Sequence, residues 1–97
     1  MEKINRGEKF RLIDVRDTPD YEKEHIVGAI HLLIGEMMPD RLEALVEKDD
    51  LIITYSEDLN CPAKTIAAQK LVDMGYTNVF AYEGSWNEWK ESGYPVE

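Results

Sequence analysis

The chain has 97 residues, a length that suits one domain with a single buried core and is too short for two. Hydrophobic residues make up 43% of the sequence, with two Trp, two Phe and five Tyr, a composition that argues against an intrinsically disordered chain. Acidic residues outnumber basic ones by 20 to 11, and the net charge of -9 opposes nucleic-acid binding, so we expect neither nucleic acid nor an anionic membrane as a partner.

The cysteine content and the start of the chain indicate the compartment. Cys61 is the single cysteine, so an internal disulfide is impossible. The first ten residues, MEKINRGEKF, lack the apolar core of a signal peptide, and no apolar run is long enough to span a bilayer. We therefore expect a soluble cytoplasmic protein, one domain over residues 1–97 and, from its small size and single expected site, a monomer.

Short apolar runs recur along the chain, each bounded by charged or turn residues. They predict buried strands at 12–15, 29–33, 51–55 and 79–82. Helical stretches follow these runs at 18–25, 39–48, 62–75 and 85–93. Because strands alternate with helices, the pattern predicts βαβ units and a parallel sheet covered on both faces.

The stretch 62–75 gives the clearest helix signal. Pro62 suits the first helical position and Gly75 can end the helix in a left-handed conformation. The apolar residues at helical spacing, which predict one buried face, are Ile66, Ala67, Leu71 and Met74. Cys61 then lies at or next to the N-cap.

Two segments of the sequence resemble a known family. LIDVRDTPDYEKEHIVGAIHL resembles the amino-terminal half of a rhodanese-like domain, and GYTNVFAYEGSWNEWKESGYPV resembles the closing segment of that family. The resemblance implies an α/β/α sandwich with a central, mainly parallel sheet of four or five strands. It also implies a reactive loop between a central strand and the next helix, which here runs from Ser56 to Cys61. Because the chain starts close to its first recognised strand, four strands are the simpler expectation.

The same resemblance implies sulfur chemistry. In the family, a cysteine directly after the strand accepts sulfane sulfur from a donor such as thiosulfate and passes it to a thiophilic acceptor, while N–H groups of the loop stabilise the persulfide. The residue at this position is Ser56, which cannot carry a persulfide, and Cys61 follows five residues later in a lengthened loop. The usual loop arginine is absent, which leaves Lys64 as the cation. Thiosulfate-type activity is therefore an open question.

Opposing charges surround Cys61 in the sequence. A helix N-terminus lowers the pKa of a thiol, whereas the carboxylates of Glu57 and Asp58 raise it and repel anionic donors. One pKa unit corresponds to about 1.4 kcal/mol, so these effects are similar in size. A reactive thiol and a partly buried helix-cap residue both fit the sequence. A phosphatase does not fit, because no arginine closes the loop.

Four residues of the family motif outside the loop are structural candidates. Asp14 and Arg16 belong to the DVR segment, where we favour an ion pair or capping network over a part in substrate binding. For His25 we favour a hydrogen-bonded structural role over that of a general base for Cys61. Gly28 lies where a turn with positive φ is convenient.

The remaining candidates have simpler interpretations. His31 has no cysteine or histidine at ligand spacing, so we expect no metal site. Trp86 and Trp89, three residues apart, are predicted to anchor the last helix in the core. Met37 and Met38 fit either ordinary core filling, which is the default, or an apolar rim for a partner.

Two hypotheses for the function follow. The first is a sulfurtransferase or sulfane-sulfur carrier in which Cys61 is the nucleophile, a small sulfur donor or acceptor is the partner, and no metal or organic cofactor is needed. The loop would be shaped by the residues between strand and cysteine, namely Ser56, Glu57, Asp58, Leu59 and Asn60. The second hypothesis is a catalytically inactive module that binds a protein partner or senses oxidants.

Overall fold

The computed structural model describes residues 10–57 and 62–97. The strands are β1 (Arg11–Asp14), β2 (Ile30–His31), β3 (Ile52–Tyr55) and β4 (Val79–Ala81). The helices are α2 (Thr18–Lys23), α3 (Pro39–Leu45), α4 (Ala63–Asp73), α5 (Ser85–Glu91) and the short 3-10 helix η1 (Ile34–Glu36). Each predicted strand and helix is therefore present; β1 is shifted by one residue from the predicted 12–15, the other elements are shorter than predicted, and η1 is an addition.

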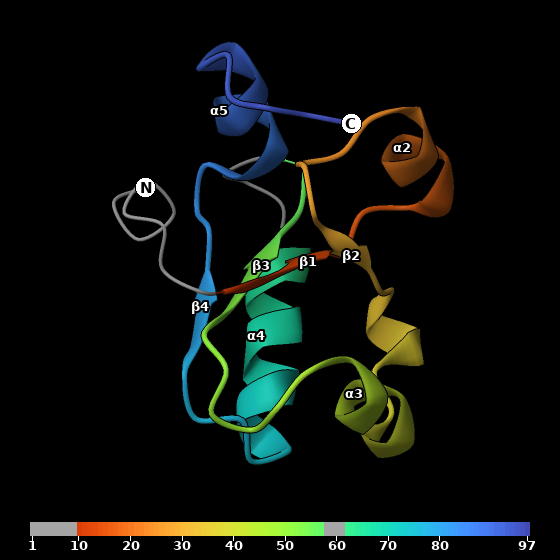
Figure 1. The fold of residues 1–97 in the computed structure, drawn as a ribbon, viewed down its shortest axis with the longest axis vertical. Coiled ribbons are helices and arrows are strands. Elements are labelled where there is room, and N and C mark those ends of the chain that lie inside the picture. The colour runs from red at the N-terminus through yellow and green to blue at the C-terminus, as the bar shows by residue number, and fades with distance from the viewer. Residues whose placement is uncertain (1–9, 58–61) are drawn as a thin grey trace.

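In the described part of the chain the strands form one parallel sheet in the order β2-β1-β3-β4 (Figure 1). At the end of β1, Asp14 is paired with Tyr55 of β3 on one side and with His31 of β2 on the other. Because all strands are parallel, their carboxyl ends meet at the same edge of the sheet. The sheet and its flanking helices confirm the predicted α/β architecture.

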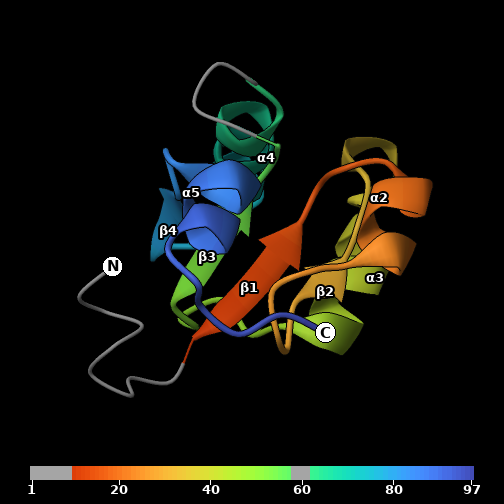
Figure 2. The same cartoon turned by 90° about the horizontal axis from the view of Figure 1, so that it is seen from above.

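The sheet separates two hydrophobic cores. Neighbouring residues of a strand face opposite sides, so Ile13 and Ile52 enter one core while Leu12 and Ile53 enter the other. The first core includes Leu42 of α3 and the buried stripe of α4. The second lies against α5 and the segment after α2, with Ile26 and both tryptophans (Figure 2). Trp86 and Trp89 are buried, which confirms their predicted place in the core.

Helix α4 begins one residue later than predicted, with Pro62 as its N-cap. Its inner face holds Ala67 and Leu71, both fully buried, as expected. The prediction for Ile66 is wrong, because its side chain is 51% exposed. Lys64, three residues before Ala67, occupies the inner face instead and is only 3% exposed.

The last residues of the chain pack beside the segment that follows α2, as both views of the ribbon show (Figures 1 and 2). Backbone hydrogen bonds join His25 and Glu97 in both directions, at 3.0 and 2.8 Å, and Ile26 forms an antiparallel bridge with Val96. Gly28 adopts φ +82°, the positive angle expected for this turn, and its N–H donates to a carboxylate oxygen of Glu97.

The two adjacent methionines have different surroundings. Met37 is fully buried in the first core, whereas Met38 is 57% exposed. Ordinary core filling is therefore confirmed for Met37 alone. Within the described residues, no helix is long and apolar enough to cross a membrane.

Candidate functional site

Three segments meet at the carboxyl edge of the sheet. They follow β1, β3 and β4, and each continues from the strand without an intervening element. In open parallel sheets, ligands bind outside this edge. The reactive loop expected from the sequence begins here, directly after Tyr55.

Asp14 and Arg16 form a buried ion pair after β1. Arg16 Nη2 lies 3.0 Å from Asp14 Oδ2, Nε also donates to this carboxylate, and the two side chains are 4% and 0% exposed. Nη2 also donates to the carbonyl oxygen of Glu24, at 2.6 Å. Burial alone would lower the pKa of Arg16, but the hydrogen bonds and charge of Asp14 outweigh it and raise the pKa. This geometry supports the structural role favoured for the pair.

Tyr55 completes the surroundings of the Asp14 carboxylate. Its hydroxyl donates to Asp14 Oδ2 at 2.5 Å and accepts a hydrogen bond from the N–H of Ile26. Burial, followed by the hydrogen bond and charge of Asp14, raises the pKa of Tyr55 far above its ordinary value. The phenol therefore remains protonated and holds the end of β3 to β1 and to the second core.

Arg16 also reaches the start of the expected loop. Its guanidinium lies over the Trp86 ring, 4.3 Å from the centroid, and Nη1 is 3.7 Å from a carboxylate oxygen of Glu57. The Glu57 side chain is 48% exposed, so this ion pair is partly screened by solvent. Arg16 thus offsets part of the negative charge that Glu57 brings to the loop.

A small polar pocket of about 150 Å³ adjoins this ion pair. Three basic and three acidic side chains line it together with Trp86: Arg16, Lys23, Lys90, Asp20, Glu24 and Glu57. The Lys90 ammonium pairs with the Glu24 carboxylate, and its hydrogen bond lowers the pKa of Glu24. Because the charges balance, the pocket does not select an anion by net charge.

Ser56 is held to the first residues of α5 through its backbone. Its N–H donates to Ser85 Oγ at 3.1 Å, and its carbonyl accepts from the N–H of Trp86 at 3.0 Å. The carbonyl of Glu57 accepts from the N–H of Asn87, also at 3.0 Å. Ser56 is 1% exposed, so these groups belong to the protein interior.

The helix that follows the expected loop is fixed to β3. Thr54 Oγ1 donates to the carbonyl of Lys64 at 2.7 Å, which holds the first turn of α4 against the strand. Lys64, the expected loop cation, is a buried residue of α4. Asp58, Leu59, Asn60 and Cys61 lie outside the described residues.

The two histidines lie beside Tyr21. Their rings stack on it at centroid distances of 3.8 Å for His25 and 4.6 Å for His31. His25 Nδ1 lies 2.8 Å from the carbonyl of Tyr21, and Nε2 lies 3.3 Å from a Glu97 carboxylate oxygen. His31 Nε2 contacts the carbonyl of Arg16. In the described ranges no group of three metal-ligating side chains occurs.

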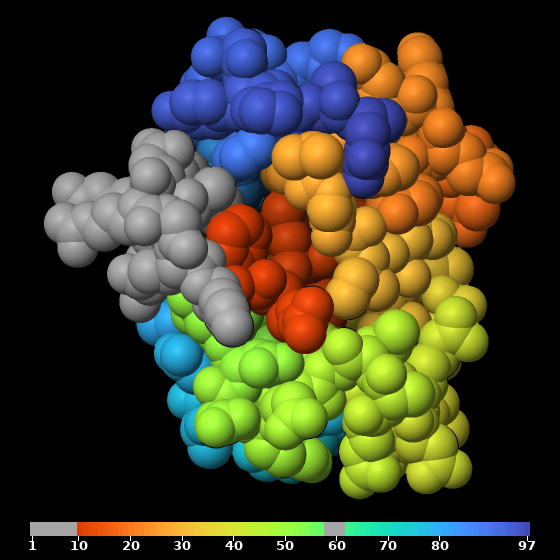
Figure 3. Space-filling model, viewed as in Figure 1, coloured from red at the N-terminus to blue at the C-terminus, as the bar shows by residue number. Residues whose placement is uncertain are grey.

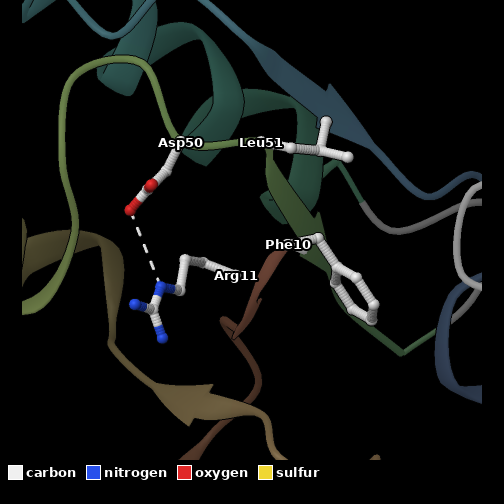
Figure 4. A pocket seen from close by; sticks show the side chains of 4 residues that line it. All are labelled: Phe10, Arg11, Asp50 and Leu51. Carbon is white, nitrogen blue, oxygen red and sulfur yellow. Dashed lines mark ion pairs between the residues drawn. The ribbon is translucent and has the colours of Figure 1, made fainter. Parts of the chain in front are cut away.

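A larger hollow of about 340 Å³ lies at the opposite edge of the sheet, where β1 and β3 begin (Figure 4). Phe10, Arg11, Asp50 and Leu51 line it, and Arg11 forms an ion pair with Asp50. In Figure 3 the residues of β1, in red, are visible between the blue carboxyl-terminal segment and the green segment before β3. The hollow contains no residue that the sequence marks for sulfur chemistry.

Comparisons with known proteins agree with this architecture. The family model of the rhodanese-like domain matches residues 1–92. Thiosulfate sulfurtransferase GlpE of Coxiella burnetii is 33% identical over 79 residues, which are 81% of this chain and 70% of that protein. The putative sulfur carrier protein YrkF of Bacillus subtilis is 27% identical over 88 residues, which are 91% of this chain and 45% of that protein.

Solved structures lead to the same family. The BH2092 protein of Bacillus halodurans has a TM-score of 0.88 and 31% identity, with 99% of this chain and 69% of that chain covered. The Rhodanese_3 like domain of Alr3790 from Anabaena has a TM-score of 0.81 and 31% identity, with 91% and 98% covered. A parallel α/β sandwich with its candidate site at the carboxyl edge is the class that these features define. The chain belongs to the family of rhodanese-like domains.

Proposed function

We propose that this protein is a sulfurtransferase or sulfane-sulfur carrier in which Cys61 forms the persulfide. The observation that carries this proposal is the place of the single cysteine, directly before the N-cap of α4, in the segment that joins β3 to that helix. The named activities of GlpE and YrkF support the same chemistry. The partners would be small sulfur donors and acceptors, in a reducing compartment such as the cytoplasm.

The proposed reaction has two steps. The Cys61 thiolate attacks the outer sulfur of thiosulfate, so that a cysteine S–S bond forms, the bond to the sulfonate sulfur breaks, and sulfite leaves with the electron pair. A thiophilic acceptor then removes the outer sulfur and restores the thiolate. Sulfur and thiolate supply the whole chemistry, so neither a metal nor an organic cofactor takes part.

The electrostatics around the site favour a thiolate more than the sequence alone suggests. α4 has 11 residues, and the dipole at its N-terminus favours an anion at the residues that precede it. The ion pair of Arg16 with Glu57 offsets one of the two carboxylates that oppose this effect. Both contributions favour the reactive form of Cys61.

The experiment is the intact mass of the protein after brief exposure to thiosulfate and, separately, to a persulfide donor. Sulfur loading on Cys61 predicts that the parent gains one sulfur atom, which thiols remove, and that Cys61→Ser gains none. A parent that keeps its mass with both donors, although Cys61 is alkylated by iodoacetamide, would contradict the proposal.

A second function is favoured by the residue at the family's usual cysteine position. Ser56 is a buried serine, and no arginine lies between residues 56 and 61, features that fit an inactive module for protein binding or oxidant sensing. The variant Ser56→Cys in a Cys61→Ser background separates the two functions. If this variant gains sulfur and the parent does not, the fold retains the family site without its nucleophile, and the inactive module is the better conclusion.

A further inference from the structure

Ser85 has a backbone conformation that is unfavourable for its residue type. Its φ is +56°, and among the residues that the structure describes it is the one non-glycine residue with positive φ. A Cβ atom disfavours this left-handed region, so glycine is the residue usually found there. Ser85 is also fully buried, at the junction between β4 and α5. A strained backbone conformation at a buried position indicates that the side chain makes interactions that hold it there.

The Ser85 hydroxyl makes two hydrogen bonds that glycine could not make. Oγ donates to the carbonyl of Tyr82 at 2.7 Å, which fixes the direction of its lone pairs. Oγ accepts the N–H of Ser56 at 3.1 Å. Without this acceptor, the buried N–H of Ser56 at the start of the expected loop would lose this hydrogen bond.

The next two residues of α5 extend this contact to the following peptide groups. The N–H groups of Trp86 and Asn87 bind the carbonyls of Ser56 and Glu57. The described chain contains no cis peptide, and in a planar trans peptide the N–H points opposite to the carbonyl. The N–H of Glu57 therefore points away from α5.

We propose that Ser85 is a positioning residue that sets the orientation of the peptide groups at the start of the sulfur-carrying loop. This role of Ser85 rests on the proposed function of Cys61. The Ser85 hydroxyl holds the N–H of Ser56 while the amides behind it hold two carbonyls, so that the N–H of Glu57 lies on the face of the loop turned away from α5. The strained φ is kept because it places Oγ between Tyr82 and Ser56.

The test uses Ser85→Ala and Ser85→Gly, which both remove the hydroxyl, although only the glycine relieves the positive φ. Trp89→Phe is the matched control on the same helix, because it removes the bond from Nε1 to the carbonyl of Pro95 and leaves the hydrogen bonds of Ser56 and Glu57 to α5 in place. The first readout is amide exchange of Ser56 by NMR, which should be faster in both Ser85 variants and unchanged in the control.

The second readout is the pH profile of Cys61 alkylation by iodoacetamide, which requires no sulfur loading. If loop N–H groups stabilise the thiolate, both Ser85 variants should shift the midpoint upward by about half a pH unit, so that alkylation at pH 7 becomes about threefold slower. Trp89→Phe should have the same pH profile of alkylation as the parent, even where it is less stable. A Ser85→Gly protein that is folded and has the parent profile would overturn the inference.

Sulfur loading of the parent is measured in parallel and separates the two proposals. If the Ser85 variants have a shifted profile and the parent gains no sulfur, the positioning role is retained and the sulfur-carrying function is rejected. If the Ser85 variants have the parent profile and the parent gains sulfur, the positioning role alone is rejected.

Discussion

The hydroxyl of Tyr55 donates a 2.5 Å hydrogen bond to Oδ2 of Asp14, across the two central strands of the sheet. The same carboxylate accepts from the backbone N–H of Arg16, at 2.8 Å, and from its guanidinium. Asp14 thereby joins the ends of β1 and β3 directly beneath the segments that hold the expected loop. The buried charge is compensated by donors from Arg16, which follows β1, and from Tyr55 of β3.

Replacement of Tyr55 by Phe is expected to lower the free energy of unfolding by about 2–3 kcal/mol, because a buried carboxylate loses a charge-assisted donor. Urea denaturation measures the effect. Tyr76→Phe is the control, since the Tyr76 hydroxyl is buried without a hydrogen-bond partner in the described structure. The control should stay within about 0.5 kcal/mol of the parent. Equal losses in the two variants would show that the Tyr55–Asp14 bond contributes little.

Alkaline pH should destabilise the protein partly through Tyr55. Burial and Asp14 raise the pKa of Tyr55 in the folded state, whereas in the unfolded chain it titrates near its ordinary 10.0. Above pH 10 the unfolded state therefore binds fewer protons than the folded state, so stability falls as pH rises. Tyr55 contributes about 1.4 kcal/mol per pH unit to this fall. The stabilisation is fully present below pH 10.

Urea unfolding of the parent and of Tyr55→Phe between pH 9 and pH 11 checks this expectation. The free energy of unfolding of the parent should fall more steeply with pH than that of Tyr55→Phe. The difference in slope should be about 1.4 kcal/mol per pH unit, which corresponds to one proton. The raised pKa values of Tyr21, Tyr76 and Tyr82 are present in both proteins and cancel in the comparison. Parallel curves would mean that Tyr55 ionises in the folded state as readily as in the unfolded chain.

Loss of Arg16 should be more damaging than loss of an exposed arginine. Arg16→Met leaves the buried Asp14 carboxylate without its cation, and a cost of about 3–5 kcal/mol is expected. Arg16→Lys should recover only part of this, because a lysine cannot reproduce the guanidinium's several hydrogen bonds. Arg11→Met is the control: its ion pair with Asp50 is 3.6 Å long and the Arg11 side chain is 55% exposed, so about 0–1 kcal/mol is expected.

Glu57→Gln should speed the loading of sulfur from thiosulfate. The change removes a half-exposed carboxylate from the start of the loop and thus weakens the repulsion of a dianionic donor. A two- to threefold rise in the second-order rate at low salt is expected, and about 0.5 M salt should abolish it. Glu43→Gln on α3 changes the net charge equally at an exposed position outside the candidate site and should leave the rate unaltered. A salt-independent rise in both variants would refute this electrostatic account.

Much of the fold was predictable because the strands have a simple pattern. Runs such as 51–55 are largely apolar, and the strand they form is buried along its whole length, as expected for a parallel strand covered on both faces. The strand predicted at 29–33 is shorter in the structure, limited to Ile30–His31, because only these two residues pair with β1, through Ile13 and Asp14. The length of that pairing depends on β1 and cannot be read from one segment.

The details of the candidate site depend on tertiary contacts that leave little trace in the sequence. The buried stripe of α4 includes Lys64 and omits Ile66, whereas hydrophobicity alone predicts a buried Ile66 and an exposed Lys64. The approach of Arg16 to Glu57 joins residues 41 positions apart. The role of Ser85 was missed because serine is common in loops. A positive φ becomes visible only when the whole connection from β4 to α5 is built.

The anchoring of Ser56 and Glu57 to α5 has a consequence for how this family can vary. The bonds to Ser85, Trp86 and Asn87 engage main-chain N–H and carbonyl groups of the loop, which almost every amino acid possesses. A substitution at position 56 or 57 therefore leaves these anchors intact. A sulfur-bearing residue can move to a new place along such a loop by point mutation and insertion, while the frame that presents it stays the same.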